Sequence, residues 1–213
     1  MNPHVNTIGN RLSLRPPQRE SLEILARVCD LIPMEKSADL AQAQKRIQSE
    51  FPTVTDFERD FASLCFALAT GVGKTRLMGA FITYLFRAEN IRHFFVLAPN
   101  LTIYNKLIAD FTPNEPKYVF QGIAEFAVNP PLVITGENYL DGRGVRREGY
   151  LPGATWERDV HINIFNISKI TSTETPKGGI KSNVSRFRRL QEYIGQSYFE
   201  YLSKLDDLVL LMD

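Results

Sequence analysis

Residues 69–75, Ala-Thr-Gly-Val-Gly-Lys-Thr, have the side chains and spacing that bind phosphate groups. Glycine permits tight turns and close approach of the backbone to a phosphate, and Gly71 and Gly73 meet that need. We expect Lys74 to reach the β- and γ-phosphates of a nucleoside triphosphate, and the Thr75 hydroxyl to bind the accompanying Mg²⁺. A helix that begins here would point its positive N-terminal end at the phosphates. The sequence therefore predicts a phosphate-binding loop made by Thr70, Gly71, Val72, Gly73, Lys74 and Thr75.

The pattern departs from the strict G-x-x-x-x-G-K-[ST] form at its first position, where the chain has Leu68. The core G-x-G-K-T remains, and the flanking segments have the composition that the motif requires. Residues 61–68 are apolar enough for a buried strand, and residues 76–87 have apolar side chains at helical spacing. A strand, a glycine loop and a helix in succession favour a phosphate-binding loop over an ordinary glycine-rich turn.

The apolar run of residues 208–212 ends in Asp213 and has the form of a Walker B strand. A buried strand would carry the Asp213 carboxylate beside the phosphate loop, where it would hold Mg²⁺ together with Thr75. An ordinary core strand with a solvated end looks the same, and the pairing with the loop favours the Walker B interpretation. Lys74 and Asp213 are thus the candidate catalytic residues. Because a catalytic carboxylate normally follows that aspartate directly, we expect the chain to be a fragment of a longer protein.

Buried strands and helices alternate along the chain. After an irregular lead-in over residues 1–14, we expect helices over about 15–32, 38–50, 76–87, 101–111, 184–194 and 197–205. We expect strands over residues 61–68, 94–98, 117–121, 132–135, 161–167 and 208–212. This order predicts an α/β fold, with a parallel sheet covered by helices on both faces and ligands at the carboxyl ends of the strands. The glycine-rich residues 136–159 are predicted to be a surface excursion, and residues 172–182 a loop.

Net charge, hydropathy and cysteine content give no sign of a strongly basic protein, a membrane span or a cysteine metal site. The 213 residues carry a net charge of +1, so any nucleic-acid binding must depend on local patches. Two arginine clusters, near residues 143–147 and 186–189, lie among acidic residues and are interpreted as solvated surface. No apolar run reaches 18 residues, so we expect no membrane span. Cys29 and Cys65 form no metal or redox motif, and reduced thiols in the cytoplasm are the simple interpretation.

The order of motifs resembles superfamily 2 helicases and translocases, above all the Res subunit of type III restriction enzymes and related DEAD/DEAH-box proteins. Residues 15–18 resemble the Q-type motif, residues 69–75 motif I and residues 96–101 motif Ia. Residues 164–169 resemble the strand before motif II, and residues 210–213 resemble its first half. The resemblance implies that residues 15–213 form an incomplete first RecA-like lobe of the P-loop NTPase class, which binds ATP and Mg²⁺.

The resemblance also implies roles for three polar side chains. Gln18 would read the adenine edge, because an amide both donates and accepts hydrogen bonds, as adenine requires. Pro17 stands where relatives often have an aromatic residue. Asn100 and Thr102, at the end of a predicted strand, would contact the phosphates of DNA, or they cap the helix that follows.

Taken together, the resemblance implies the ATP-binding N-terminal part of an ATP-dependent DNA helicase or translocase, from a type III restriction-modification or related phage-defence system. A cytoplasmic location and a separate methylation and specificity subunit would follow. We expect the fragment alone to hydrolyse very little nucleotide. A P-loop ATPase without a nucleic-acid role and an inactive truncated remnant remain open as alternatives.

Overall fold

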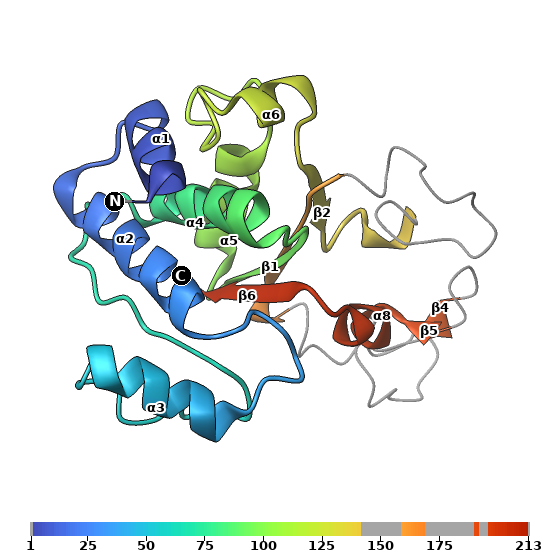
Figure 1. Ribbon diagram of the computed structural model, residues 1–213. Coiled ribbons are helices and arrows are strands. Elements are labelled where there is room, and N and C mark those ends of the chain that lie inside the picture. Colours follow the sequence, from blue (N-terminus) through green and yellow to red (C-terminus); the bar gives the residue numbers. More distant parts are fainter. Residues whose placement is uncertain (1, 142–158, 169–189, 192–195, 213) are drawn as a thin grey trace. The chain divides into compact units, whose positions relative to one another are not determined.

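The computed structural model describes residues 2–141, 159–168, 190–191 and 196–212 (Figure 1). Contacts divide the chain into two compact units. The helical unit consists of Met1–Asn90 and Val119–Ile123, and the sheet unit consists of Ile91–Tyr118 and Ala124–Asp213. The predicted single domain over residues 15–213 stays a prediction. No helix in the described part of the chain is long and apolar enough to cross a membrane.

The helical unit begins with α1, Pro3–Arg11, where an irregular lead-in was predicted. The Asn2 side chain accepts hydrogen bonds from the His4 and Val5 N–H groups, and Pro3 occupies the first turn. An asparagine cap followed by proline is a strong helix start. The prediction was wrong because the apolar side of α1 is narrow: Val5 and Ile8 are its fully buried side chains.

Three further helices complete this unit: α2 (Pro16–Leu31), α3 (Leu40–Glu50) and α4 (Lys74–Glu89). All three confirm predicted helices. The N-cap of α3 is Asp39, whose carboxylate accepts from the Ala41 and Gln42 N–H groups. Helices α1 and α2 both contact α4, which is buried along most of its length (Figure 1).

The predicted strand over residues 61–68 is wrong, because these residues form no strand. Phe61 is 51% exposed, whereas Leu64 packs against a buried cluster from α2 and α3 that includes Val28 and Ile47. Apolar composition marks a segment that packs, but a strand also needs a hydrogen-bonded neighbour. Here the packing of Leu64 on two helices holds the segment without strand hydrogen bonds.

The predicted strand over residues 117–121 is also wrong. This segment turns, with the Tyr118 N–H bonded to Glu115 O at 3.0 Å and the Ile123 N–H bonded to Phe120 O at 3.0 Å. Its apolar residues are buried without strand pairing: Val119, Phe120 and Ile123. The β-branched and aromatic composition therefore indicated burial and not a strand.

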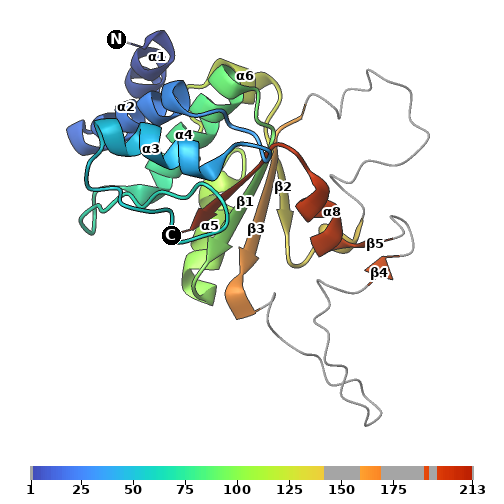
Figure 2. The same ribbon diagram turned by 60° about the horizontal axis from the view of Figure 1, so that its bottom comes forward.

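The sheet unit contains β1 (His93–Ala98), β2 (Leu132–Thr135), β3 (His161–Asn166) and β6 (Leu208–Met212) (Figure 2). The strand order is β2-β3-β1-β6, and every pair is parallel. These strands confirm four predicted strands to within a residue at each end. The helices of this unit whose bounds lie within the described residues include α5 (Leu101–Phe111), α6 (Ala124–Val128), α8 (Tyr198–Lys204) and a short 3₁₀ helix η1 (Tyr139–Asp141).

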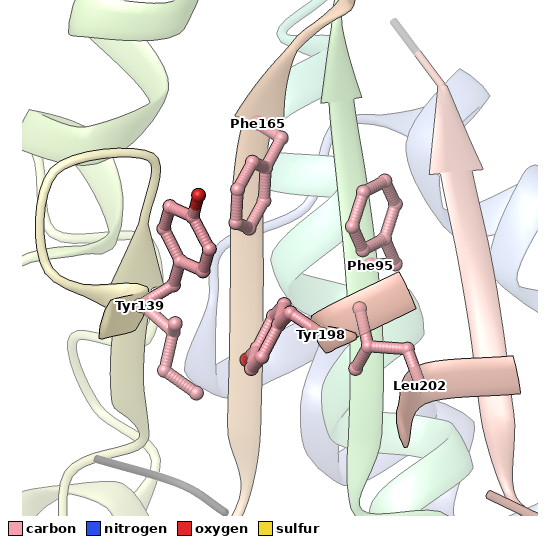
Figure 3. Close-up of a cluster of buried hydrophobic side chains, with 6 residues drawn as sticks. Phe95, Tyr139, Phe165, Tyr198 and Leu202 are labelled. Carbon is pink, nitrogen blue, oxygen red and sulfur yellow. The ribbon is translucent and has the colours of Figure 1, made fainter. Parts of the chain in front are cut away.

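The connections explain how both sheet faces are covered. From β1 the chain runs through α5 to β2, two positions away in the sheet. From β3 it runs through α8 to β6, two positions away in the opposite direction. Because parallel crossovers are right-handed, opposite directions of travel place α5 and α8 on opposite faces. Helix α5 contacts β1, β2 and β3. On the other face, Tyr198 and Leu202 of α8 pack with Phe95, Tyr139 and Phe165 (Figure 3).

Two predicted elements lie partly outside the described residues. Of the predicted helix over 184–194, residues 190 and 191 instead form the short strand β4 (Leu190–Gln191), which pairs antiparallel with β5 (Gln196–Ser197). The rest of that helix, the loop over 172–182 and residues 142–158 of the glycine-rich excursion lie outside the described residues.

Candidate phosphate-binding site

The loop predicted from its glycines has the backbone conformation that glycine permits. Gly71 has φ 81° and Gly73 has φ 93°, both in the left-handed region that side chains with a Cβ rarely adopt. Gly73 is the N-cap residue of α4, and the helix begins at Lys74. The loop therefore ends at the N-terminus of a 16-residue helix, whose unpaired N–H groups and positive dipole end attract anions.

The two glycines are required for different reasons. A Cβ at Gly71 would meet no atom within 4 Å, so only its φ calls for glycine there. A Cβ at Gly73 would lie 2.7 Å from Gln18 Nε2, closer than real Cβ contacts come. Gly73 is thus required by its φ and by the close approach of α2.

Gln18 is the predicted site residue that the fold brings against this loop. Its side chain is buried, with 2% exposed, and its Nε2 donates to Gly73 O at 2.8 Å. Its Oε1 accepts from the backbone N–H of Arg15, the N-cap residue, at 2.8 Å, which caps the start of α2. The amide therefore joins the first turn of α2 to the N-cap of α4.

Two arginines that were not predicted also make contacts here: Arg15 bonds to the loop, and Arg76 bonds to the C-cap residue of α1. Arg15 Nη1 donates to Gly71 O at 3.2 Å, and Arg76 Nη1 of α4 donates to Leu12 O at 3.0 Å. No local signal marks the Arg15 contact, because its partner is a backbone carbonyl 56 residues away. Nothing in the local sequence announces the Arg76 contact, because its partner is a backbone carbonyl 64 residues away.

Lys74 and Thr75 occupy the first turn of α4. Lys74 is partly exposed and Thr75 is buried, with 8% exposed. They belong to the helical unit, whereas the Walker B candidate β6 belongs to the sheet unit, so a shared Mg²⁺ site stays a prediction. Asp213 lies outside the described residues. The strand leading to it is an outer strand of the described sheet and not the buried strand predicted: Leu210 is 43% and Met212 is 64% exposed.

Asn100 and Thr102 follow β1, as predicted. Asn100 is the N-cap of α5, and its Oδ1 accepts from the Ile103 N–H at 2.9 Å. Thr102 is exposed in the first turn of the same helix. Of the two roles considered for Asn100, the structure contains the cap, and contact of either residue with DNA stays a prediction.

Comparison with known proteins places this geometry in a family. No curated protein and no solved structure is significantly similar to the chain. A family model does match, and it covers residues 11–213, which include the corner at Arg15 and Gln18, the glycine loop and β6. That family is a helicase superfamily 2 domain family with the RecA-like P-loop NTPase fold. The chain belongs to the family described as the Res subunit of type III restriction enzymes.

Proposed function

We propose that this chain is the ATP-binding N-terminal part of an ATP-dependent DNA helicase or translocase of a type III restriction-modification or related phage-defence system. The observation that carries the proposal is the loop at residues 70–75, with two left-handed glycines at the N-terminus of α4. Membership of a helicase-like ATPase family supports it. In this proposal the protein acts in the cytoplasm, and its partner is a separate methylation and specificity subunit, as the resemblance to type III systems implies.

Each site residue has a role in this proposal. The loop N–H groups and the Lys74 ammonium bind the β- and γ-phosphates and stabilise the charge that develops during phosphoryl transfer. The Thr75 hydroxyl and the Asp213 carboxylate would hold Mg²⁺, which would offset the negative charge of the phosphates. Asn100 and Thr102 lie after β1 and contact the DNA backbone, which positions the strand without reading its sequence.

ATP hydrolysis by the intact protein tests the proposal, measured with and without double-stranded DNA. A Lys74→Ala variant is the control, because it removes the phosphate-binding cation from the exposed start of a helix without opening a core. Hydrolysis that DNA stimulates, and that the substitution abolishes, supports a DNA-dependent motor. Hydrolysis that is indifferent to DNA but still depends on Lys74 contradicts the DNA role and favours a P-loop ATPase of another kind. Wild-type protein that neither binds nor hydrolyses ATP would identify an inactive remnant.

A further inference from the structure

We propose that Gln18 and Arg15 position the phosphate-binding loop by holding the carbonyl groups of Gly73 and Gly71, and that Gln18 does not read the adenine base. The proposal rests on the phosphate-binding function of the loop and changes what the site recognises. The site then recognises the triphosphate, and Gln18 does not discriminate between bases.

The hydrogen bonds of the Gln18 amide argue against base reading. An amide that reads adenine must turn one oxygen and one N–H together toward the base edge. In Gln18 the oxygen turns back to the Arg15 N–H, at 2.8 Å, and the nitrogen turns to Gly73 O, at 2.8 Å. With only 2% of the residue exposed, the amide is enclosed by its own helix and the loop.

Holding these carbonyl groups has a consequence for phosphate binding. In a planar trans peptide, the C=O of one residue and the N–H of the next point in opposite directions. Gly73 O accepts from Gln18 Nε2 at 2.8 Å and from the Leu77 N–H at 3.2 Å, so the Lys74 N–H of the same peptide points away from both donors. This orients the first N–H of α4 outward from the helix end, where an anion binds.

Arg15 acts in the same way on the peptide between Gly71 and Val72. Its Nη1 donates to Gly71 O at 3.2 Å, which directs the Val72 N–H away from α2. Alternate carbonyls of the loop are thus drawn toward α2, and alternate N–H groups are released on the other side. Backbone N–H groups gathered in this way form an anion-binding nest.

Equilibrium binding to the intact protein tests this role, with calorimetry of ATP, GTP and inorganic tripolyphosphate in the presence of Mg²⁺. Gln18→Met keeps the side-chain volume and removes both hydrogen bonds. We expect it to weaken all three ligands by the same factor, about threefold to tenfold, because the loss is one of loop orientation. Tripolyphosphate has no base, so weaker binding of tripolyphosphate can come only from a changed loop and not from lost contacts to a base.

Matched variants control for stability and charge. Ser21→Ala removes another buried polar group of α2, whose hydroxyl donates to Pro17 O within the same helix, and should leave binding unchanged. Arg15→Ala is expected to weaken all three ligands, and because Arg15 is exposed it tests the proposal even if Gln18→Met does not fold. Arg19→Ala removes an equal charge from α2, where the guanidinium bonds to Asn10 instead, and should have a smaller effect.

The outcomes separate the two levels of the proposal. A loss in Gln18→Met that is confined to ATP would overturn it and restore adenine reading. Unchanged binding of all three ligands would also overturn it. If wild-type protein binds none of them, and Lys74→Ala is no different, then the phosphate-binding function itself has failed.

Discussion

His93 Nδ1, at the start of β1, lies 2.6 Å from Asp207 Oδ1, directly before β6. The second oxygen of the same carboxylate, Oδ2, accepts from the Arg92 N–H at 2.8 Å. One carboxylate thus fastens the beginnings of two neighbouring parallel strands, at the end of the sheet opposite to the strand tips that lead to Asn100 and Asp213. It sets the point at which β6 joins β1.

Removing this carboxylate should loosen β6. We expect Asp207→Ala to lower the free energy of unfolding by about 2 kcal/mol at pH 7, because two charge-assisted hydrogen bonds are lost at a half-buried position. Urea denaturation measures the difference. Asp206→Ala is the matched control, since Asp206 is its exposed neighbour, and an equal loss in the two variants would contradict the role of Asp207.

The same carboxylate predicts a pH dependence. Burial raises the pKa of Asp207, but the hydrogen bonds from His93 and the Arg92 N–H, with the charge of His93, lower it more, so the net pKa lies below the ordinary 3.8. A depressed pKa in the folded state means that the contribution is fully present above the unfolded pKa and is lost as the pH falls through the folded one. The stability gap between wild type and Asp207→Ala should be present at about pH 5 to 7 and shrink below about pH 4. A gap that closes between pH 5 and 7 would contradict this.

The two loop glycines should respond differently to alanine. Gly71→Ala introduces backbone strain alone, at about 1–2 kcal/mol for an L-residue in the left-handed region. Gly73→Ala adds the clash of its Cβ with Gln18 Nε2, so we expect a larger loss of stability and disruption of the Gln18 bond to the loop. Thermal unfolding of both variants measures the difference. Equal destabilisation would show that the close approach of Gln18 to residue 73 does not affect stability.

The elements that were predicted correctly are those whose signals are local. Helix α4 combines a glycine cap with apolar side chains at helical spacing, and β3 has β-branched and aromatic residues, Ile162, Ile164 and Phe165, within six residues. The error at residues 61–68 has a different source. Leu64 packs on α2 and α3 and Phe66 contacts Phe81 of α4, and no local pattern says whether an apolar segment will find a strand partner or a helix face.

The candidate site divides in the same way. The left-handed conformations of Gly71 and Gly73 followed from their residue type and the motif, because glycine is the residue that adopts them without strain. The partner of the Gln18 amide did not follow, since Gly73 is 55 residues away in the chain and an amide can face a base or a backbone carbonyl equally well. Residue type limits what a side chain can bind, and the fold decides which partner it meets.

Asn138 closes the outer side of β2, which is an outer strand of the described sheet. Its Oδ1 accepts from the Thr135 N–H at 2.7 Å, and its Nδ2 donates to Val133 O at 3.3 Å. These are backbone groups that a further strand would otherwise pair. We expect Asn138→Ala to lower stability by about 1 kcal/mol and to increase self-association, measured by light scattering against concentration. Asn138→Asp keeps the acceptor for the Thr135 N–H and should self-associate less than Asn138→Ala. An alanine variant that stays monomeric would show that the side chain does not protect the edge.

Tyr198 anchors α8 to the sheet through a buried hydrogen bond to Asn163 Oδ1 on β3. The same Asn163 side chain donates from Nδ2 to Phe94 O at 3.1 Å, so one amide links α8, β3 and β1. Tyr198→Phe keeps the ring packed against Tyr139 and Phe165 (Figure 3) but leaves Asn163 Oδ1 without this donor in a buried place. We expect a loss of about 1–3 kcal/mol in the free energy of unfolding, because a buried acceptor without its donor pays its full desolvation.

Tyr201→Phe is not a suitable control, because the partly buried Tyr201 also packs on this cluster. Phe199→Ala is suitable, because Phe199 is 42% exposed on the same helix. Urea denaturation of Tyr198→Phe and Phe199→Ala compares a lost buried hydrogen bond with a lost exposed ring. If the loss in Tyr198→Phe is the smaller of the two, α8 is held by packing alone. If it is the larger, the hydrogen bond to Asn163 fixes the position of α8 on the sheet, which ring packing, being non-directional, does not do.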